Sequence, residues 1–383
     1  MPSLIRDRPA SSPAMLAVFG DEALLDAALR FESSLSQAQA DVGVIDQASA
    51  AAIAAACVER PDVELLAEAA AHAGTLAIPL VDIVRRRIAD PAIAKLVHKG
   101  ATSQDLADTA LMLQAKAGAA LIVEEALRLA DGLATLAQAH AATPMLGRTL
   151  LQGALPITFG LKVAGWLQGV TGALARFERE TAAIQLQLGG ATGSLAGLDG
   201  KARAVTERLA VLLDLPAADT PWHSRREGLA GLASSLAILT GAVGKIAGDI
   251  ALLAQGEVAE AQEPRVQGRG GSSAMAHKRN PTSCQVALTA AVRAPHLATT
   301  ITAALPQQQH ERGVGGWQAD APVLADLFQL THGALTAMTP VIEGLEVDAD
   351  RMAANLAAAG VGADIGESEA LTLRALAAYQ KDR

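Results

Sequence analysis

The feature that most limits the fold of this chain is the length of its alanine- and leucine-rich runs. One run extends from Asp105 to about Ala141 and another from Gly228 to about Ala261, and neither contains a proline. Alanine is the best helix former, and small side chains let helices approach closely. Hydrophobic residues make up 51% of the chain but aromatic residues only 2%, so Ala, Leu, Ile and Val must build the core. The runs therefore predict an all-α protein organised around an elongated helical bundle.

Glycine and proline breaks divide the chain into helices and suggest three parts. We expect an N-terminal helical domain over residues 1–104, a central bundle over 105–343 and a short C-terminal segment over 344–383. The first 20 residues read as an irregular arm, and the residues after about Ala359 read as a short tail. Breaks and helical periodicity place helices at about 21–42, 47–59, from 62, 79–88, 105–141, 156–188, 201–213, 228–261, 281–305, 321–343 and 348–359.

Charge and cysteine content exclude several classes of function. The formal net charge is −9, which argues against nucleic-acid binding, although local basic patches would suit an anionic substrate. Cys57 and Cys284 are far apart and lack metal-ligand spacing, so we expect no disulfide, no metal and a reduced, cytoplasmic setting. The uncharged stretch 228–244 contains glycines and hydroxyl residues, which favours a buried helix over a membrane span. No apolar signal-peptide core follows the N-terminus.

The densest cluster of reactive side chains is the stretch 265–284, RVQGRGGSSAMAHKRNPTSC. Its three glycines make a helix interior costly, by about 1 kcal/mol each relative to alanine, so the segment is predicted to be a loop. A glycine loop that carries hydroxyls and Lys278 can stabilise developing negative charge and activate a serine. A flexible surface loop leading into a helix is the competing interpretation.

Two further polar patches lie before long helices. HKGATSQD, residues 98–105, ends where the helical run to Ala141 begins, so Thr102 or Ser103 is expected to cap that helix. The same helix N-terminus could bind a carboxylate. TPMLGRTLLQGALPITFG, residues 143–160, offers Arg148, Thr149 and Gln152 between two helical runs. A third cluster, His223 with Arg225 and Arg226, reads as a solvated helix end.

These patches resemble, in order, the signature regions of the fumarase/aspartase superfamily of β-eliminating lyases. GSSAMAHKRNP is similar to the family loop GSSxMPxKxNP, with Ala276 where proline is usual, and HKGATSQD is similar to HxGxTSxD. Residues 147–158 are similar to GxTHxQxAxPxT, except that Leu150 replaces the histidine. HERG at 310–313 resembles the lyases generally, and GGWQAD at 315–320 resembles their cycloisomerase branch.

The resemblance implies the site residues and the assembly. It implies Ser272 as the general base, Lys278 as the group that stabilises an aci-carboxylate, and His98 as a further catalytic candidate. It also implies substrate contacts from Thr102, Ser103, Arg148, Thr149, Gln152, Ser273, Met275, Asn280 and Arg312. No cofactor and no metal are implied. Family members are homotetramers whose active sites combine regions of three subunits, and a shared site for a small anionic tricarboxylate is therefore expected.

The missing histidine at position 150 selects among the family reactions. An amine leaving group must be protonated to depart, whereas a carboxylate, with a pKa of about 4, leaves as the anion. The resemblance therefore implies cycloisomerisation of 3-carboxy-cis,cis-muconate to a carboxymuconolactone, a step of protocatechuate degradation. Three alternatives stay open: an adenylosuccinate-lyase-like elimination, a cycloisomerase of another polycarboxylate, and a non-catalytic helical scaffold.

Overall fold

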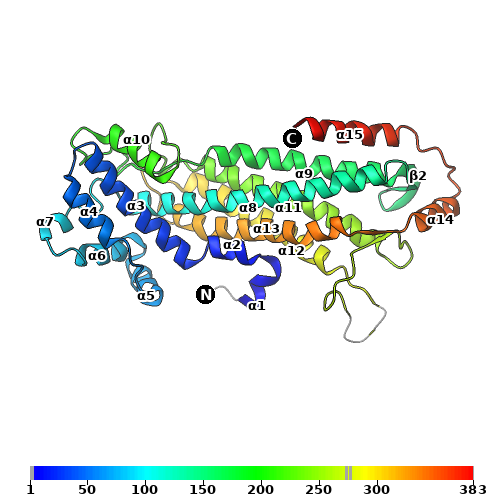
Figure 1. Cartoon of the computed structure of the whole chain (residues 1–383), viewed down its shortest axis with the longest axis horizontal. Coiled ribbons are helices and arrows are strands. Elements are labelled where there is room, and N and C mark those ends of the chain that lie inside the picture. Colours follow the sequence, from blue (N-terminus) through cyan, green and yellow to red (C-terminus); the bar gives the residue numbers. More distant parts are fainter. Residues whose placement is uncertain (1–3, 272–274, 276–277, 383) are drawn as a thin grey trace.

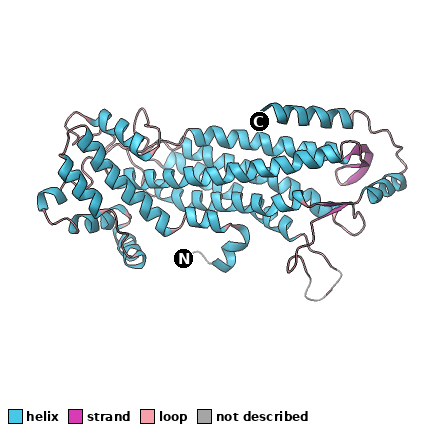
Figure 2. Ribbon diagram, in the orientation of Figure 1, coloured by secondary structure: helices cyan, strands magenta, loops and turns pink. Residues whose placement is uncertain are grey.

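The computed structural model describes residues 4–271, 275 and 278–382, and this part of the chain is mostly helical (Figures 1 and 2). The main helices are α3 Asp21–Asp41, α4 Gln47–Ala56, α5 Val63–Ala73, α6 Ala77–Arg86, α7 Pro91–Ala94, α8 Ser103–Ala139, α9 Phe159–Ala182, α10 Ala202–Leu213, α11 Glu227–Leu253, α12 Thr282–Ala304, α13 Asp320–Glu343, α14 Ala349–Ala359 and α15 Ser368–Asp382. Short helices α1 Leu4–Asp7 and α2 Pro13–Val18 and single 3-10 turns at Arg8–Ala10, Leu305–Gln307 and Trp317–Ala319 complete the helical elements. An antiparallel hairpin pairs β1 Pro144–Thr149 with β2 Gln152–Thr158, and a second, short antiparallel pairing joins the sequence-distant strands β3 Ala261–Gln262 and β4 Glu346–Val347.

Five long helices, α8, α9, α11, α12 and α13, run side by side and form the elongated bundle (Figure 1). Helix α8 has 37 residues, which at 1.5 Å per residue makes it about 55 Å long. Its buried positions Ala126, Leu129, Ala130 and Leu133 recur at helical spacing and are fully enclosed. The all-α bundle predicted from the alanine-rich runs is confirmed.

The bundle has two differently built ends (Figure 1). At the end where α8 begins, α3 to α7 and α10 form a helical cap. The end where α8 finishes carries the β1–β2 hairpin, α14 and the loop between β3 and α12. The length of α8 thus separates the two ends of the molecule.

Several predictions about local structure are wrong. The stretch before Asp21 is helical in short pieces, because Ser12 accepts a hydrogen bond from the Met15 amide at 3.0 Å and Pro13 suits a first helical turn. The C-terminal tail contains α15, which packs along α9. Helix α9 ends at Ala182 and α11 at Leu253, both earlier than the periodicity indicated.

The segment around Pro156 is also not helical, since it belongs to β2. The β1–β2 hairpin turns through Leu150 and Leu151, both with left-handed backbone (φ 51° and 63°). Two-residue hairpin turns with positive φ usually contain asparagine and glycine, so leucines gave no signal of this turn.

Helices α8 and α11 are long and apolar enough to cross a membrane by length and composition alone. Half or more of their most apolar windows is buried inside the protein, and both pack against other long helices. They are core helices of the bundle.

Candidate active site

The start of α8 is fixed by a buried carboxylate. Asp105 is fully enclosed and accepts hydrogen bonds from the backbone amides of Thr102, Gly189 and Gly190, each at 2.9 Å. His223 Nε2 lies 2.7 Å from the same carboxylate. Thr102 is the N-cap and Ser103 the first helical residue, so the predicted cap is confirmed.

Arg312 joins this region from the connection between α12 and α13. Its Nη1 donates to Thr102 Oγ1 at 2.9 Å, and its Nη2 donates to the carbonyls of Ala191 at 3.0 Å and Gly190 at 3.3 Å. Within the part of the chain that the structure describes, Arg312 Nε is buried without a hydrogen-bond partner. The structure therefore brings two predicted substrate contacts, Thr102 and Arg312, into direct contact.

His98 lies in the turn before α8 and has left-handed backbone, with φ 67°. Its Nδ1 is 2.5 Å from Oε1 of Glu32, a fully buried side chain on α3. Burial alone would lower the pKa of His98, but the charge and hydrogen bond of Glu32 outweigh it and raise the pKa above its usual value.

A buried ionic network lies beneath the start of α8. Arg226 makes a bidentate contact with Asp108 at 2.7 and 2.9 Å, and its Nε donates to Asp320 at 2.9 Å. Its guanidinium carbon lies 5.0 Å from the centre of the Trp222 ring. Burial raises the pKa of Asp320 to about 6 against the opposing charge of Arg226, and Asp108 adds to the rise.

The prediction of a solvated helix end at residues 223–226 is wrong for two of its three residues. His223 is 3% exposed and Arg226 2%, because both serve buried carboxylates at the start of α8. Only Arg225, with its side chain 53% exposed, faces solvent.

At the opposite end of the bundle, Arg148 on β1 holds Glu260 in a bidentate ion pair with two 2.8 Å contacts. Glu260 is fully buried and also accepts from Asn355 Nδ2 at 2.8 Å. Thr149 and Gln152 are exposed at the hairpin turn. Leu150, which stands at the position of the family histidine, is 96% exposed.

The central loop starts and ends near this hairpin. Ser272 and Ser273 lie outside the described residues. Lys278 is exposed, and Met275 is 44% exposed. Asn280 closes the loop, because its amide nitrogen donates to the Gly270 carbonyl at 2.8 Å. A side chain at Gly270 would lie 2.8 Å from the Asn280 oxygen, so glycine is required there.

Positive charge surrounds the base of the loop. The hollow beside it is lined by the cationic side chains Arg265, Arg269, Lys278 and Arg279 and by one carboxylate, Glu263. That carboxylate accepts from the Ser283 and Cys284 amides at 3.2 and 2.8 Å and so caps α12. Arg279 pairs with Glu346 on β4 at 2.8 Å. A polyanionic molecule would be attracted to this hollow.

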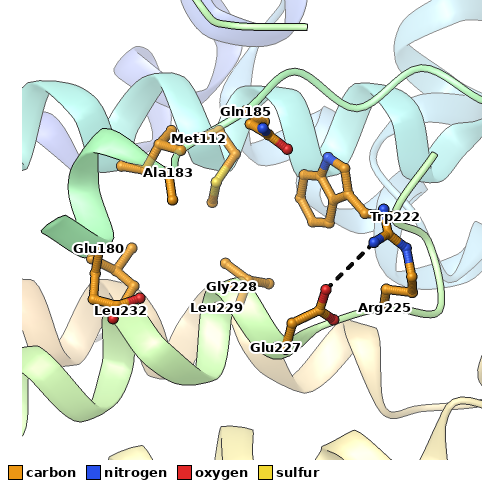
Figure 3. A pocket seen from close by; sticks show the side chains of 11 residues that line it. Met112, Glu180, Ala183, Gln185, Trp222, Arg225, Glu227, Gly228, Leu229 and Leu232 are labelled. Atoms are coloured by element: carbon orange, nitrogen blue, oxygen red, sulfur yellow. Dashed lines mark ion pairs between the residues drawn. The ribbon is translucent and has the colours of Figure 1, made fainter. Parts of the chain in front are cut away.

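A second hollow lies on the flank of the bundle between α9 and α11, next to Trp222 (Figure 3). Its charged side chains are Glu180, Glu227 and Arg225, and the last two are paired at 3.6 Å. The remaining negative charge would repel a polycarboxylate, so this hollow is not the substrate site. In the described residues, no group of three or more His, Cys, Asp or Glu side chains could hold a metal ion.

The predicted site residues thus form two separate groups. His98, Thr102, Ser103 and Arg312 lie where α8 begins, whereas Arg148, Thr149, Gln152, Met275, Lys278 and Asn280 lie beyond its other end. About 55 Å of helix separates the groups within one chain.

Comparison with known proteins identifies the family. A family described as lyases matches residues 8–295. The chain belongs to this lyase family. A 3-carboxy-cis,cis-muconate cycloisomerase of Bradyrhizobium diazoefficiens is 47% identical over 350 residues, which are 90% of this chain and 77% of the relative. A nitrosuccinate lyase of Streptomyces davaonensis is 41% identical over 378 residues, 96% of this chain and 79% of the relative.

The fold of this lyase-family chain matches a solved relative over its whole length. The 3-carboxy-cis,cis-muconate lactonizing enzyme of Pseudomonas putida superposes with a TM-score of 0.88 at 40% identity, covering 100% of this chain and 89% of that one. The resemblance to the fumarase/aspartase superfamily is confirmed, and the chain is an enzyme.

Sequence reasoning missed three charged residues that the fold places in these groups. Glu32 lies on the buried face of α3, and Glu260 holds Arg148. Lys162 on α9 is a third, since burial lowers the pKa of its ammonium group near Asp249. An acidic residue on the apolar face of a helix, as at Glu32, was the one available signal.

Proposed function

We propose that this lyase-family chain is a cycloisomerase that converts 3-carboxy-cis,cis-muconate into a carboxymuconolactone, in the cytoplasmic degradation of protocatechuate. The observation that carries the proposal is Leu150. An uncharged, exposed leucine stands where an amine-eliminating lyase needs an acid, and the 47% identical relative is a cycloisomerase. Adenylosuccinate-type elimination is disfavoured for the same reason.

The chemistry is an addition within one molecule. A carboxylate oxygen of the substrate attacks an alkene carbon, one C–O bond forms, and the electron pair of the alkene moves toward the neighbouring carboxylate as an aci-carboxylate. Ser272 then gives its proton to the α-carbon and regains one from solvent, so that the reaction takes up one proton overall. No acid is needed at the attacking oxygen.

The cationic hollow supports this intermediate. An aci-carboxylate carries extra negative charge, and Lys278 with the side chains of Arg265 and Arg269 would stabilise it more than the substrate. Arg312 and Thr102 would bind another carboxylate at the start of α8. A non-catalytic scaffold does not require such a cluster of positive charges, whose mutual repulsion disfavours folding.

A second candidate is a lyase that expels an anionic group from a substituted succinate. The nitrosuccinate lyase that is 41% identical over 96% of the chain favours it. A nitro group would also depart as an anion, so Leu150 does not separate the two reactions. The products do: elimination forms a new alkene and a free anion, whereas cycloisomerisation removes a conjugated diene.

We further propose a homotetramer with shared sites. The two groups of site residues lie at opposite ends of α8, so one chain cannot enclose a small substrate with both. Two antiparallel copies would place the start of one α8 beside the loop of another. The hairpin tip supports such a contact, because Leu150, Leu151 and Leu155 are 96%, 75% and 72% exposed.

The first experiment follows the ultraviolet absorbance of 3-carboxy-cis,cis-muconate and, in a parallel assay, the release of nitrite from nitrosuccinate. We expect loss of the diene absorbance with the wild type and a rate reduced by about 10²–10⁴-fold in Ser272→Ala. Lys278→Met should lose activity as well, while Lys381→Met, an exposed lysine on α15, should not. Nitrite release without diene loss would replace the first candidate by the second.

The assembly is tested by light scattering and by mixing variants. We expect a mass about four times the 39.1 kDa protomer. Ser272→Ala and Arg312→Met chains should each be inactive, and activity should return when they are mixed, because some sites then combine two intact regions. A monomer with full activity would refute shared sites.

A further inference from the structure

The buried pair between α3 and the turn before α8 has the geometry of a positioned functional group. The side chain of Glu32 is fully buried and that of His98 is 14% exposed, and the two meet at 2.5 Å through Oε1 and Nδ1. Since a carboxylate oxygen can only accept, Nδ1 must donate. Within the part of the chain that the structure describes, Nε2 makes no hydrogen bond, and it is therefore the nitrogen left for a ligand.

The backbone around His98 is held in an uncommon conformation. Residues with side chains seldom adopt a positive φ, and His98 has φ 67°. Two residues later, Gly100 has φ 72°, and a Cβ there would lie 2.5 Å from Leu198. Gln39, near the C-terminal end of α3, donates from Nε2 to the Lys99 carbonyl at 2.7 Å. Strained backbone fixed from several sides is typical of functional sites.

The burial of Glu32 requires a positive partner. A lone buried carboxylate is strongly disfavoured, and Glu32 Oε2 has no hydrogen-bond partner among the described residues. The pair is therefore stable when the imidazole is protonated. An imidazolium held in this way presents a second N–H from Nε2, and this N–H suits a carboxylate.

We propose that Glu32 is a positioning residue that acts through His98: it holds the imidazole by Nδ1, keeps it cationic, and presents Nε2–H to a carboxylate of the substrate. The proposal rests on the proposed function for the identity of that substrate. Thr102 and Arg312 also lie at the start of α8, and Arg312 adds a positive charge there that favours an anionic group.

Other charges near His98 determine how strongly Glu32 acts. Asp105 on α8 favours the protonated imidazole, and Arg85 on α6 opposes it. Both are less influential than Glu32, which is hydrogen-bonded to the ring. The cationic form is present below the raised pKa of His98 and is lost as pH rises through it.

The test compares Glu32→Gln with the wild type in two measurements. The titration of His98 is followed by NMR of ¹³C-labelled histidine, with its signal assigned from the spectrum of His98→Gln among the eight histidines of the chain. We expect the pKa of His98 to fall by about one unit or more when the charge of Glu32 is removed. In the kinetic assay, we expect KM to rise about tenfold at pH 8, with kcat little changed, and to recover at pH 6.

Gln39→Leu is the matched control. This substitution removes another buried polar contact between α3 and the same turn without changing the charge. The pKa of His98 should therefore stay at its wild-type value. Glu32→Asp keeps the charge and should retain most of the wild-type pKa. Thermal unfolding of each variant shows whether the fold is intact.

The outcomes separate this inference from the proposed function. An unshifted His98 titration in Glu32→Gln overturns the role of Glu32, whatever the activity. A loss of activity equal at pH 6 and pH 8 also overturns it, since a merely structural residue behaves in that way. Failure of the wild type to consume the muconate would instead refute the proposed function, while the titration still decides the role of Glu32.

Discussion

Replacing Arg226 by methionine tests the buried network beneath the start of α8. Methionine fills much of the space of the arginine stem but removes the charge that Asp108 and Asp320 share. The side chains of all three residues are 3% exposed or less, so solvent cannot replace the lost contacts. Arg226 is also the largest fully buried side chain in the described part of the chain.

The magnitude follows from the two carboxylates that are left behind. Removing one partner from a buried ion pair costs about 3–5 kcal/mol in the free energy of unfolding. Part of that cost depends on pH, because a carboxylate that binds a proton no longer needs a cation. The pKa of Asp320 is already about 6 with Arg226 present, and it would rise further without it. We therefore expect a loss of about 3–5 kcal/mol at pH 8 and a loss smaller by about 1–3 kcal/mol at pH 5.

The direction in which the stability of Arg226→Met changes with pH follows from proton binding. In the variant, the folded state holds protons on Asp320 at pH values where the unfolded chain has released them. The stability of the variant must therefore fall more steeply than that of the wild type as pH rises above the unfolded pKa of about 4.

Urea unfolding at fixed protomer concentration, followed by circular dichroism at pH 5 and pH 8, measures both values. Arg225→Met is the matched control. The Arg225 side chain is next to Arg226 in the sequence but 53% exposed, so its replacement should change the free energy of unfolding by less than about 0.5 kcal/mol. Adding Asp320→Asn to Arg226→Met should recover part of the loss at pH 8. A loss no larger than that of Arg225→Met, or one equal at the two pH values, would contradict the reasoning.

Two further substitutions test the site turn and the hairpin. Gly100→Ala places a methyl group 2.5 Å from Leu198 at positive φ, and we expect a loss of about 2–4 kcal/mol by denaturation, whereas Gly74→Ala, with φ 73° and no atom within 4 Å, should lose only about 1 kcal/mol. Leu150→Asp should shift the protein toward smaller assemblies in light scattering, and Val58→Asp, at an 81% exposed position, should not. Equal losses at the two glycines, or an unchanged assembly in Leu150→Asp, would count against these assignments.

The long helices could be predicted from sequence because their cause is local. Alanine and leucine favour helix, and Thr102 followed by Asp105 specifies where α8 starts. The hairpin could not be predicted in the same way. Leu150 and Leu151 adopt a left-handed turn that their side chains do not favour, and the pairing of β1 with β2 on either side of them closes it.

The sequence indicated only those candidate site residues that belong to local motifs. Polar residues in loops were visible as motifs, so Thr102 and Arg312 could be named as candidates, and the fold brings them into contact. Glu32 and Arg226 were not named as candidates, because their roles depend on partners 66 and 94 or more positions away in the sequence. A glutamate in an amphipathic helix is usually solvated, and only the packing of α3 against the turn at His98 shows that this one is buried.

The separation of the two residue groups explains why the motifs alone do not describe a site. Each motif is read from a few neighbouring residues, yet Thr102 stands at the start of α8, a helix about 55 Å long, and the cationic loop lies at the other end of the bundle in the same chain. A small polycarboxylate cannot touch both groups unless another copy supplies one of them. If copies do so, then the exposed, strained leucines of the hairpin and the unsatisfied Arg312 Nε have a common explanation. Both would be features of a site that is incomplete in one chain and is completed by residues of another copy.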